Sequence, residues 1–147
     1  MKIYLAADHA GYELKEKLKK VLADLNYDTE DFGPLELTPE DDYPDYVAPA
    51  MQALQNDHKS KAIVMCKNGV GVSMMANKYK GIRAGLSFSK KHATTARTDD
   101  DINVLALPAN YIKFEDAVET VAAFLNTPFS NNTRHTRRLN KIQKIEK

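Results

Sequence analysis

Residues 62–73 read Ala62-Ile63-Val64-Met65-Cys66-Lys67-Asn68-Gly69-Val70-Gly71-Val72-Ser73, and this stretch decides the fold. Its first five residues are apolar, which is typical of a short strand buried on both faces of a sheet. The two glycines that follow permit a tight turn, and the residues beyond them are expected to form a helix. The stretch therefore predicts a strand, a turn and the start of a helix, as in an α/β fold.

Outward from this stretch, strand-like and helix-like segments alternate along the chain. The apolar residues between 14 and 25, for example, recur at the spacing of one helix face. Strands are expected at 2–7, 27–32, 62–66, 82–86 and 103–107, and helices at 14–25, 46–54, 69–77, 90–98, 114–125 and 133–145. Parallel strands connected by helices carry helices on both faces of their sheet. The sequence predicts one α/β sandwich domain, residues 1–147, with a parallel sheet of about five strands.

The composition excludes several classes of protein. Hydrophobic residues make up 43% and charged residues 28% of the 147 residues, as in an ordinary single globular domain. Twenty-one basic and twenty acidic residues leave a net charge of +1, which argues against a nucleic-acid partner. The N-terminus lacks the pattern of a signal peptide, and no apolar run is long enough to cross a membrane. We therefore expect a cytoplasmic protein with neither a nucleic-acid nor a membrane partner.

The cysteine and histidine content argues against a metal centre. One cysteine, Cys66, excludes an intrachain disulfide and any multi-cysteine metal site. No two histidines have the i, i+4 spacing that places both on one helix face. The three successive carboxylates at 99–101 do not converge on one cation as those of a calcium loop do. No metal site is expected.

Charge is balanced overall and uneven along the chain. Residues 28–45 contain eight acidic residues, no Lys or Arg and three prolines, which is typical of an irregular loop. Residues 134–147 contain six basic residues and one acidic residue, and Leu139, Ile142 and Ile145 recur among them at helical spacing. This pattern predicts a C-terminal helix that docks through one side and turns its polar side to water or to an anion.

In open parallel sheets, ligands bind beyond the carboxyl ends of the strands. This rule directs attention to Asp8-His9, to the turn at 66–69 and to the residues around Asp99 and Leu107. The turn offers free N–H groups at the start of a helix, which bind a phosphate or a developing oxyanion. It lacks the third glycine of a dinucleotide fingerprint, and the chain has no P-loop pattern. A plain strand-to-helix turn is the alternative interpretation.

Cys66 is the candidate for chemistry in this turn. A thiol at the end of a strand, beside Lys67 and the start of a helix, is in a position that favours the thiolate. The alternative is an inert buried cysteine that packs as a small apolar residue.

Two further groups of residues could bind polar or anionic groups of a ligand. Asp8 and His9 could bind sugar hydroxyls and phosphate, respectively; alternatively, Asp8 caps the following helix and His9 is exposed. Arg134, Arg137 and Arg138 stand at i, i+3 and i+4, so two of them share a helix face, and guanidinium groups bind phosphate well. For the arginines, a solvated basic face is the alternative.

Six motifs then carry a resemblance to a known family. They are, in chain order, Ala7-Asp8-His9-Ala10-Gly11-Tyr12-Glu13-Leu14-Lys15, Asp41-Asp42-Tyr43-Pro44-Asp45-Tyr46, residues 66–71 with Ser73 and 76–78, Gly81-Ile82-Arg83-Ala84, Asn103-Val104-Leu105-Ala106-Leu107 and Arg134-His135. Their order and spacing over nearly the full chain resemble the ribose-5-phosphate isomerase B family, which includes the subunits of galactose-6-phosphate isomerase. The resemblance implies a Rossmann-like three-layer α/β/α sandwich and a homodimer or tetramer whose sites form at a dimer interface, where the helix at about 133–145 docks.

The resemblance also implies a reaction. It is the aldose–ketose isomerisation of a phosphorylated sugar, here ribose 5-phosphate to ribulose 5-phosphate, through an enediolate and without a metal or organic cofactor. Cys66 would be the base that moves the proton between C2 and C1. The remaining roles would fall to Asn68, Lys67, Gly69, Val70 and Gly71 around the oxyanion, to Asp8, Tyr43 and Asp100 at the sugar hydroxyls, to His9, Arg134 and Arg138 at the phosphate, and to Asp99 in ring opening.

The sequence departs from the family pattern at three places. Lys67 and Asn68 stand where the family has glycine and then Thr or Ser, and the amide of Asn68 can still donate to an oxyanion. Asp99 and Asp100 replace a His-Asn pair, whose histidine opens the furanose ring in the family. Residues 108–110 replace Gly-x-Arg and remove one phosphate contact. These departures leave two alternatives open: an isomerase of another aldose phosphate, such as a hexose 6-phosphate, and a catalytically impaired homologue that binds phosphosugars.

Overall fold

The computed structural model describes residues 1–146 and contains one sheet of five parallel strands. The strands are β1 (Lys2–Ala7), β2 (Asp28–Asp31), β3 (Lys61–Cys66), β4 (Ala84–Leu86) and β5 (Val104–Pro108), in the order β2-β1-β3-β5-β4. The central strands β1, β3 and β5 are almost entirely buried, which explains their continuous apolar runs. The predicted α/β sandwich with a five-stranded parallel sheet is confirmed.

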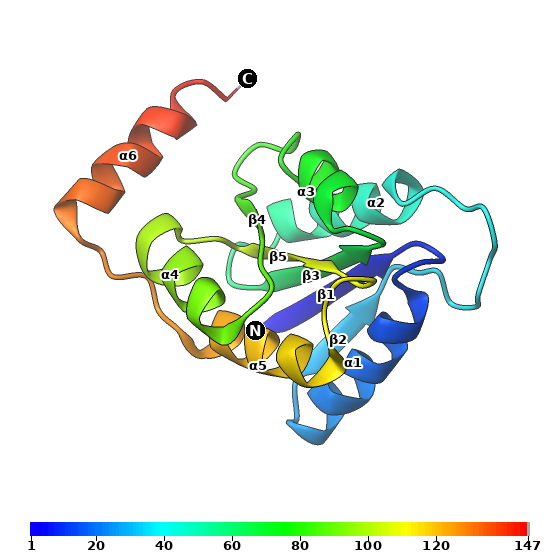
Figure 1. Cartoon of the computed structure of the whole chain (residues 1–147). Helices are drawn as coiled ribbons and strands as arrows, with labels where there is room; N and C mark the ends of the chain where they lie inside the picture. The colour runs from blue at the N-terminus through cyan, green and yellow to red at the C-terminus, as the bar shows by residue number, and fades with distance from the viewer. Residues whose placement is uncertain (147) are drawn as a thin grey trace.

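Helices cover both faces of the sheet (Figure 1). One face carries α1 (Tyr12–Asp24), α4 (Lys90–Asp100) and α5 (Phe114–Asn126), and the other carries α2 (Pro44–Gln55) and α3 (Val70–Ala76). Each face has its own apolar core; Leu18 and Phe124 are fully buried in the first, Val47 and Met51 in the second. Because side chains alternate along each strand, neighbouring strand residues enter opposite cores.

Most element boundaries differ from those expected by one or two residues. Helix α2 begins at Pro44, two residues early, because proline fits the first helical position, where no N–H is needed. Helix α4 begins after Ser89, whose hydroxyl accepts a hydrogen bond from the backbone N–H of His92, and it continues to Asp100, beyond the expected end at 98.

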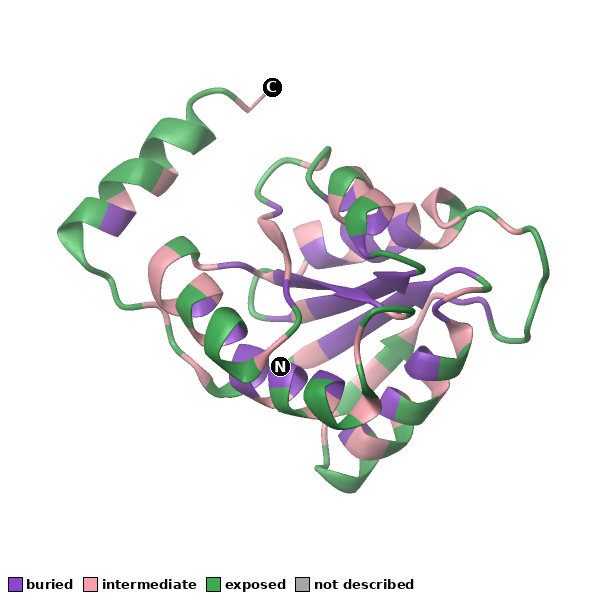
Figure 2. Ribbon diagram, viewed as in Figure 1, coloured by how far each residue is buried: buried purple, intermediate pink, exposed green. Residues whose placement is uncertain are grey.

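The C-terminal helix α6 (Thr133–Gln143) stands apart from the rest of the chain (Figure 1). It contacts α4, where His135 is buried, and Figure 2 shows it exposed over most of its surface. Leu139 is half-buried, whereas Ile142 and Ile145 are 58% and 80% exposed. One chain therefore covers only part of the apolar side of this helix, and its docking against a second copy stays a prediction.

A buried ion-pair network connects α1 with the end of β2. The Nζ atom of Lys15, whose side chain is fully buried, lies 2.6 Å from Oδ2 of Asp31, and Nζ of Lys19 lies 2.7 Å from the same oxygen. The other carboxylate oxygen of Asp31 accepts a hydrogen bond from the backbone N–H of Gly33, and the Gly33 carbonyl accepts one from Ala7. The network thus holds the last residue of β1, directly before Asp8.

No helix within residues 1–146 is long and apolar enough to cross a membrane. The cytoplasmic location expected from the sequence stays a prediction.

Candidate active site

The carboxyl ends of β1 and β3 bring Asp8 and Cys66 side by side. Ala7 pairs with Met65 in the parallel ladder, so the chain leaves the sheet at Asp8 and at Cys66 in adjacent positions. Asp8 is 7% exposed, and its Oδ1 atom accepts hydrogen bonds from the backbone N–H groups of Ala10 and Gly11, at 3.0 and 3.2 Å. The carboxylate therefore stabilises the turn that precedes α1, beside the cysteine; it does not cap the helix as the alternative interpretation expected, because the N-cap residue is Gly11 and no side chain caps it.

The turn after Cys66 has a fixed geometry. Gly69 adopts φ +74°, and a Cβ atom there would lie 3.0 Å from the backbone of Leu107, so glycine is needed for both conformation and space. Oδ1 of Asn68 accepts the backbone N–H of Val70 at 3.0 Å and faces Sγ of Cys66 at 3.8 Å. Because a backbone N–H can only donate, the atom that faces it is the amide oxygen, and the amide nitrogen is left to donate elsewhere.

Two backbone hydrogen bonds fasten this turn to the end of β5. The N–H of Ala109 donates to the Cys66 carbonyl at 2.9 Å, and that of Asn110 donates to the Lys67 carbonyl at 3.0 Å. Cys66 itself is 4% exposed, whereas Lys67 and Asn68 are exposed. The residues that replace the family's Gly-x-Arg therefore position the cysteine through their main chain.

Tyr43 lies over the first turn of α3. A Cβ atom built on Gly71 would come within 2.5 Å of the Tyr43 hydroxyl, so glycine is what lets the phenol approach the turn. Tyr43, which is expected at the sugar hydroxyls, thus lies against Gly71, which is expected at the oxyanion.

We expect Gly71→Ala to weaken substrate binding while it leaves the stability of the fold nearly unchanged. The added methyl must displace the flexible end of Tyr43, and we expect KM to rise about tenfold, the effect of one lost hydrogen bond to the substrate. Alanine is the better helix former, so the free energy of unfolding should fall by less than about 1 kcal/mol. Steady-state kinetics and thermal melts check this, with Met74→Ala, an exposed position on the same helix, as the control. An unchanged KM would contradict the prediction.

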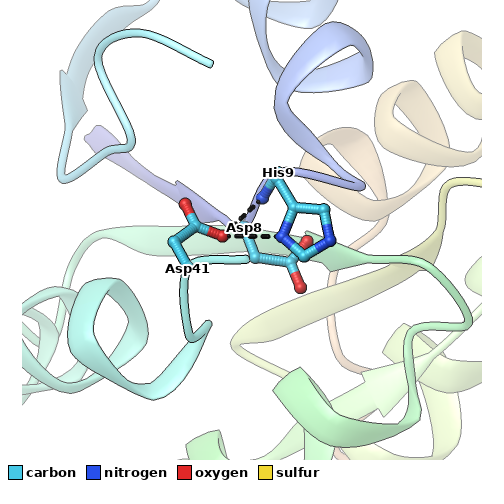
Figure 3. Close-up of side chains that lie close together, drawn as sticks. All are labelled: Asp8, His9 and Asp41. Carbon is cyan, nitrogen blue, oxygen red and sulfur yellow. Dashed lines mark hydrogen bonds and ion pairs between the residues drawn. The ribbon is translucent and has the colours of Figure 1, made fainter. Parts of the chain in front are cut away.

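His9 is held by a residue that the sequence analysis did not assign to the site. Oδ1 of Asp41 lies 2.8 Å from both the backbone nitrogen and Nδ1 of His9 (Figure 3). The hydrogen bond to Asp41 raises the pKa of His9, and the nearby carboxylate of Asp8 raises it further. Burial favours the neutral form of Asp41, but the hydrogen bonds from His9 outweigh it and lower the pKa of this carboxyl group.

Asp8, His9 and Asp41 are also the group whose ligand atoms could hold a metal ion, because these atoms lie within 4.8 Å of one another. Hydrogen bonds within the chain already account for the arrangement: Asp41 Oδ1 accepts from His9, and Asp8 Oδ1 accepts from the backbone. The expectation of a site without a metal stays a prediction.

The other predicted site residues lie on the opposite side of the sheet, at the amino ends of the strands. Helix α4 follows β4 and precedes β5, so it runs back to the amino ends of the strands and ends there with Asp99 and Asp100. Arg134 and Arg138 lie on α6, which contacts α4. Oδ1 of Asp99 lies 3.5 Å from Nε2 of the buried His135. Within one chain, none of these four residues joins Cys66.

A groove of about 380 Å³ borders this second group of residues. It lies beside the edge strand β4 and is lined by apolar side chains such as Leu86, Ile102 and Ile142, with Asp100 and His92 among them. Fold and geometry together describe an α/β domain whose predicted site residues form two groups, one at the carboxyl ends of the strands and one at their amino ends.

Comparisons with known proteins agree with this description. Residues 3–142 match the family described as Ribose/Galactose Isomerase. A probable ribose-5-phosphate isomerase B of Mycoplasma pneumoniae is 43% identical over 145 residues, which cover 99% of this chain and 95% of the relative. The ribose-5-phosphate isomerase B of Mycobacterium tuberculosis is 33% identical over 147 residues, 100% of this chain and 91% of the relative.

Solved structures of the same kind superpose closely. The ribose-5-phosphate isomerase B of Mycoplasma genitalium with bound ribulose 5-phosphate has a TM-score of 0.94 at 36% identity, covering 99% of this chain and 95% of that one. The Thermotoga maritima ribose 5-phosphate isomerase has a TM-score of 0.93 at 40% identity, covering 98% of each. The chain belongs to the ribose/galactose isomerase family and is an aldose–ketose isomerase.

Proposed function

We propose that the protein interconverts ribose 5-phosphate and ribulose 5-phosphate with Cys66 as the base. The observation that carries this proposal is the position of Cys66 in a glycine-bearing turn directly beside Asp8, at the carboxyl edge of the sheet. The relative from M. genitalium, crystallised with ribulose 5-phosphate, supports the choice of sugar.

The proposed reaction has two steps, with an enediolate between them. The Cys66 thiolate takes the proton from C2 of the open-chain aldose, the C2–H electron pair forms a C1–C2 double bond, and the carbonyl electrons move to O1. The thiol then returns the proton to C1 while the proton of the C2 hydroxyl passes to O1, and C2 becomes the carbonyl carbon. The amide nitrogen of Asn68 and the N–H groups of the turn would stabilise the charge on O1.

Binding and ring opening use residues from both edges of the sheet. Asp8 and Tyr43 would bind sugar hydroxyls, and His9 would bind the phosphate from the same edge as Cys66. Asp99, beside His135, would accept the proton of the anomeric hydroxyl; the C1–O4 bond then breaks, the C1 carbonyl forms, and the protonated Asp99 would return the proton to O4. Asp100 would bind the sugar, and Arg134 and Arg138 the phosphate. Since one chain keeps these groups apart, the proposed site contains the second group from another copy of the chain.

A mixed dimer tests this shared site. Cys66→Ala and Arg138→Ala would each inactivate both sites of their own homodimer, whereas a dimer with one chain of each kind retains one intact site. We expect co-expressed, differently tagged variants to recover about a quarter of the wild-type activity, the share given by random pairing in a two-fold symmetric dimer. Activity no higher than that of either variant alone would contradict a shared site.

A direct assay tests the reaction itself. Purified protein is incubated with ribose 5-phosphate, and formation of ribulose 5-phosphate is followed, with galactose 6-phosphate and other aldose phosphates in parallel. Turnover of ribose 5-phosphate is the expected result. Turnover of a hexose 6-phosphate alone would show that the substrate is that sugar and not ribose 5-phosphate. Binding of phosphosugars without any turnover would show a catalytically impaired homologue.

A further inference from the structure

The contact between His9 and Asp41 joins the end of β1 to the acidic loop before α2. The Asp41 side chain is only 6% exposed, whereas the His9 ring is 42% exposed. Oδ1 of Asp41 receives two contacts of 2.8 Å, one from the backbone nitrogen of His9 and one from Nδ1 of its ring. Because one oxygen of the buried Asp41 carboxylate contacts both the backbone nitrogen and the ring of His9, it fixes the orientation of that ring.

This arrangement determines which ring nitrogen of His9 carries a permanent proton. An ionised carboxylate only accepts hydrogen bonds, so Nδ1 must be the N–H donor in both the neutral and the charged ring. The proton gained or lost on titration is therefore the one on Nε2. Figure 3 shows Nε2 on the side of the ring away from Asp41, and Nε2 has no hydrogen-bond partner among residues 1–146. In the neutral ring Nε2 presents a lone pair, which repels a phosphate oxygen.

Two carboxylates act on the ring of His9. Asp41 from the loop and Asp8 from the end of β1 face it, and both raise the pKa of the imidazole. Tyr46 of α2 lies behind Asp41; its burial and the Asp41 carboxylate raise the pKa of this phenol, so it stays neutral over the working range. The imidazolium of His9 is thus favoured to higher pH than in an isolated histidine, for which the pKa is about 6.5.

We propose that Asp41 is a positioning residue for substrate binding: it holds His9 so that a protonated Nε2 donates to the phosphate of the sugar. This inference rests on the proposed function only for the identity of the anion. The tautomer and the charge of His9 are properties of the free protein and can be measured without any turnover.

The first test is NMR on the wild-type protein labelled with ¹⁵N-histidine. His9 is assigned by comparison with His9→Gln. Above the titration of the ring, we expect Nδ1 to carry the proton and Nε2 to be unprotonated. Nε2–H in the neutral ring would overturn the proposal, whatever the protein's activity, and this test needs no variant of Asp41.

The second test compares Asp41→Asn with Asp42→Asn. Both remove one negative charge from the same loop, but Asp42 is exposed and its side chain makes no hydrogen bond within residues 1–146. For Asp41→Asn we expect the imidazole of His9 to titrate at lower pH than in the wild type. The decline of kcat/KM for ribose 5-phosphate with rising pH should therefore begin at a lower pH. At pH 8, KM should rise about tenfold, the effect of one lost charge-assisted hydrogen bond, with kcat little changed. Asp42→Asn should behave as wild type.

The double variant His9→Gln/Asp41→Asn decides whether Asp41 acts through His9. We expect it to have the KM of His9→Gln alone, because no imidazole remains to be held. A further rise in KM in the double variant, or equal pH profiles for Asp41→Asn and Asp42→Asn, would overturn the proposal. Absence of turnover in the wild-type protein would refute the proposed function instead and leave the NMR result to decide the role of Asp41.

Discussion

Replacing Cys66 by alanine is expected to lower kcat for the interconversion of ribose 5-phosphate and ribulose 5-phosphate by about three orders of magnitude. A positioned general base contributes about 10²- to 10⁴-fold, and the chain offers no second thiol that could take over the role. KM should change little, because the proposed phosphate contacts of His9, Arg134 and Arg138 are untouched. Progress curves under saturating substrate measure the loss.

The fold should tolerate this substitution. Cys66 is the last residue of β3, and its ladder partner Pro108 is held through the backbone, so the smaller side chain leaves the strand pairing intact. Cys66→Ser is the matched variant, since it keeps the size of the side chain but offers a far weaker acid than a thiol. Both should elute at the wild-type size. Retention of more than a tenth of the wild-type kcat by Cys66→Ala would refute the assignment of the base.

The second large effect is expected on stability, from Asp31→Ala. Asp31 neutralises two ammonium groups, and one of them, on Lys15, is completely buried. Breaking a buried pair by removing one partner leaves an uncompensated charge and costs about 3–5 kcal/mol in the free energy of unfolding. Glu16 lies 2.9 Å from Lys15 and offsets part of that charge, so we expect a loss of about 3 kcal/mol, measured by urea denaturation.

The neighbouring strand residue provides the control. Glu30 forms an exposed pair with Lys2 at 3.5 Å, and Glu30→Ala should cost less than about 1 kcal/mol. The pH dependence differs as well. Burial works to raise the pKa of Asp31, but the hydrogen bonds from Lys15 and Lys19 outweigh it and hold that pKa below its ordinary value. The stabilisation is therefore complete above the unfolded-state pKa of about 3.9 and disappears as pH falls through the folded-state value. Equal losses for both variants would contradict the prediction.

Periodicity was sufficient to predict the fold and to place Cys66 and Asp8 at the carboxyl ends of their strands. Buried parallel strands leave continuous apolar runs, and one of these ends at Cys66; the rule for carboxyl ends then pairs it with Asp8. The same rule was wrong for Asp99, because this residue ends a helix rather than a strand. A helix that returns from β4 to the start of β5 must end at the amino edge of the sheet. The resemblance groups Asp99 with Cys66 at a dimer interface, and within one chain the two residues lie at opposite ends of the strands.

Periodicity and composition gave no role to Asp41; the only signal was its place at the start of the motif at residues 41–46. Thirty-two residues separate it from His9, and it lies in a proline-containing loop without periodicity. The loop between β2 and α2 contains four acidic residues, Glu36, Glu40, Asp41 and Asp42, and each was an equal candidate for a solvated charge. Tertiary contact, rather than local preference, selects Asp41 for burial.

The attachment of the cysteine turn to β5 has a consequence for how such a protein diverges. Asn110 is exposed and holds Lys67 through its main chain, so any non-proline residue at this position can preserve the turn. Ala109 holds Cys66 in the same way, but its side chain packs against the apolar core and must stay small. Substitution of Asn110 can therefore change the surface beside the cysteine turn while the main-chain geometry of that turn is inherited unchanged.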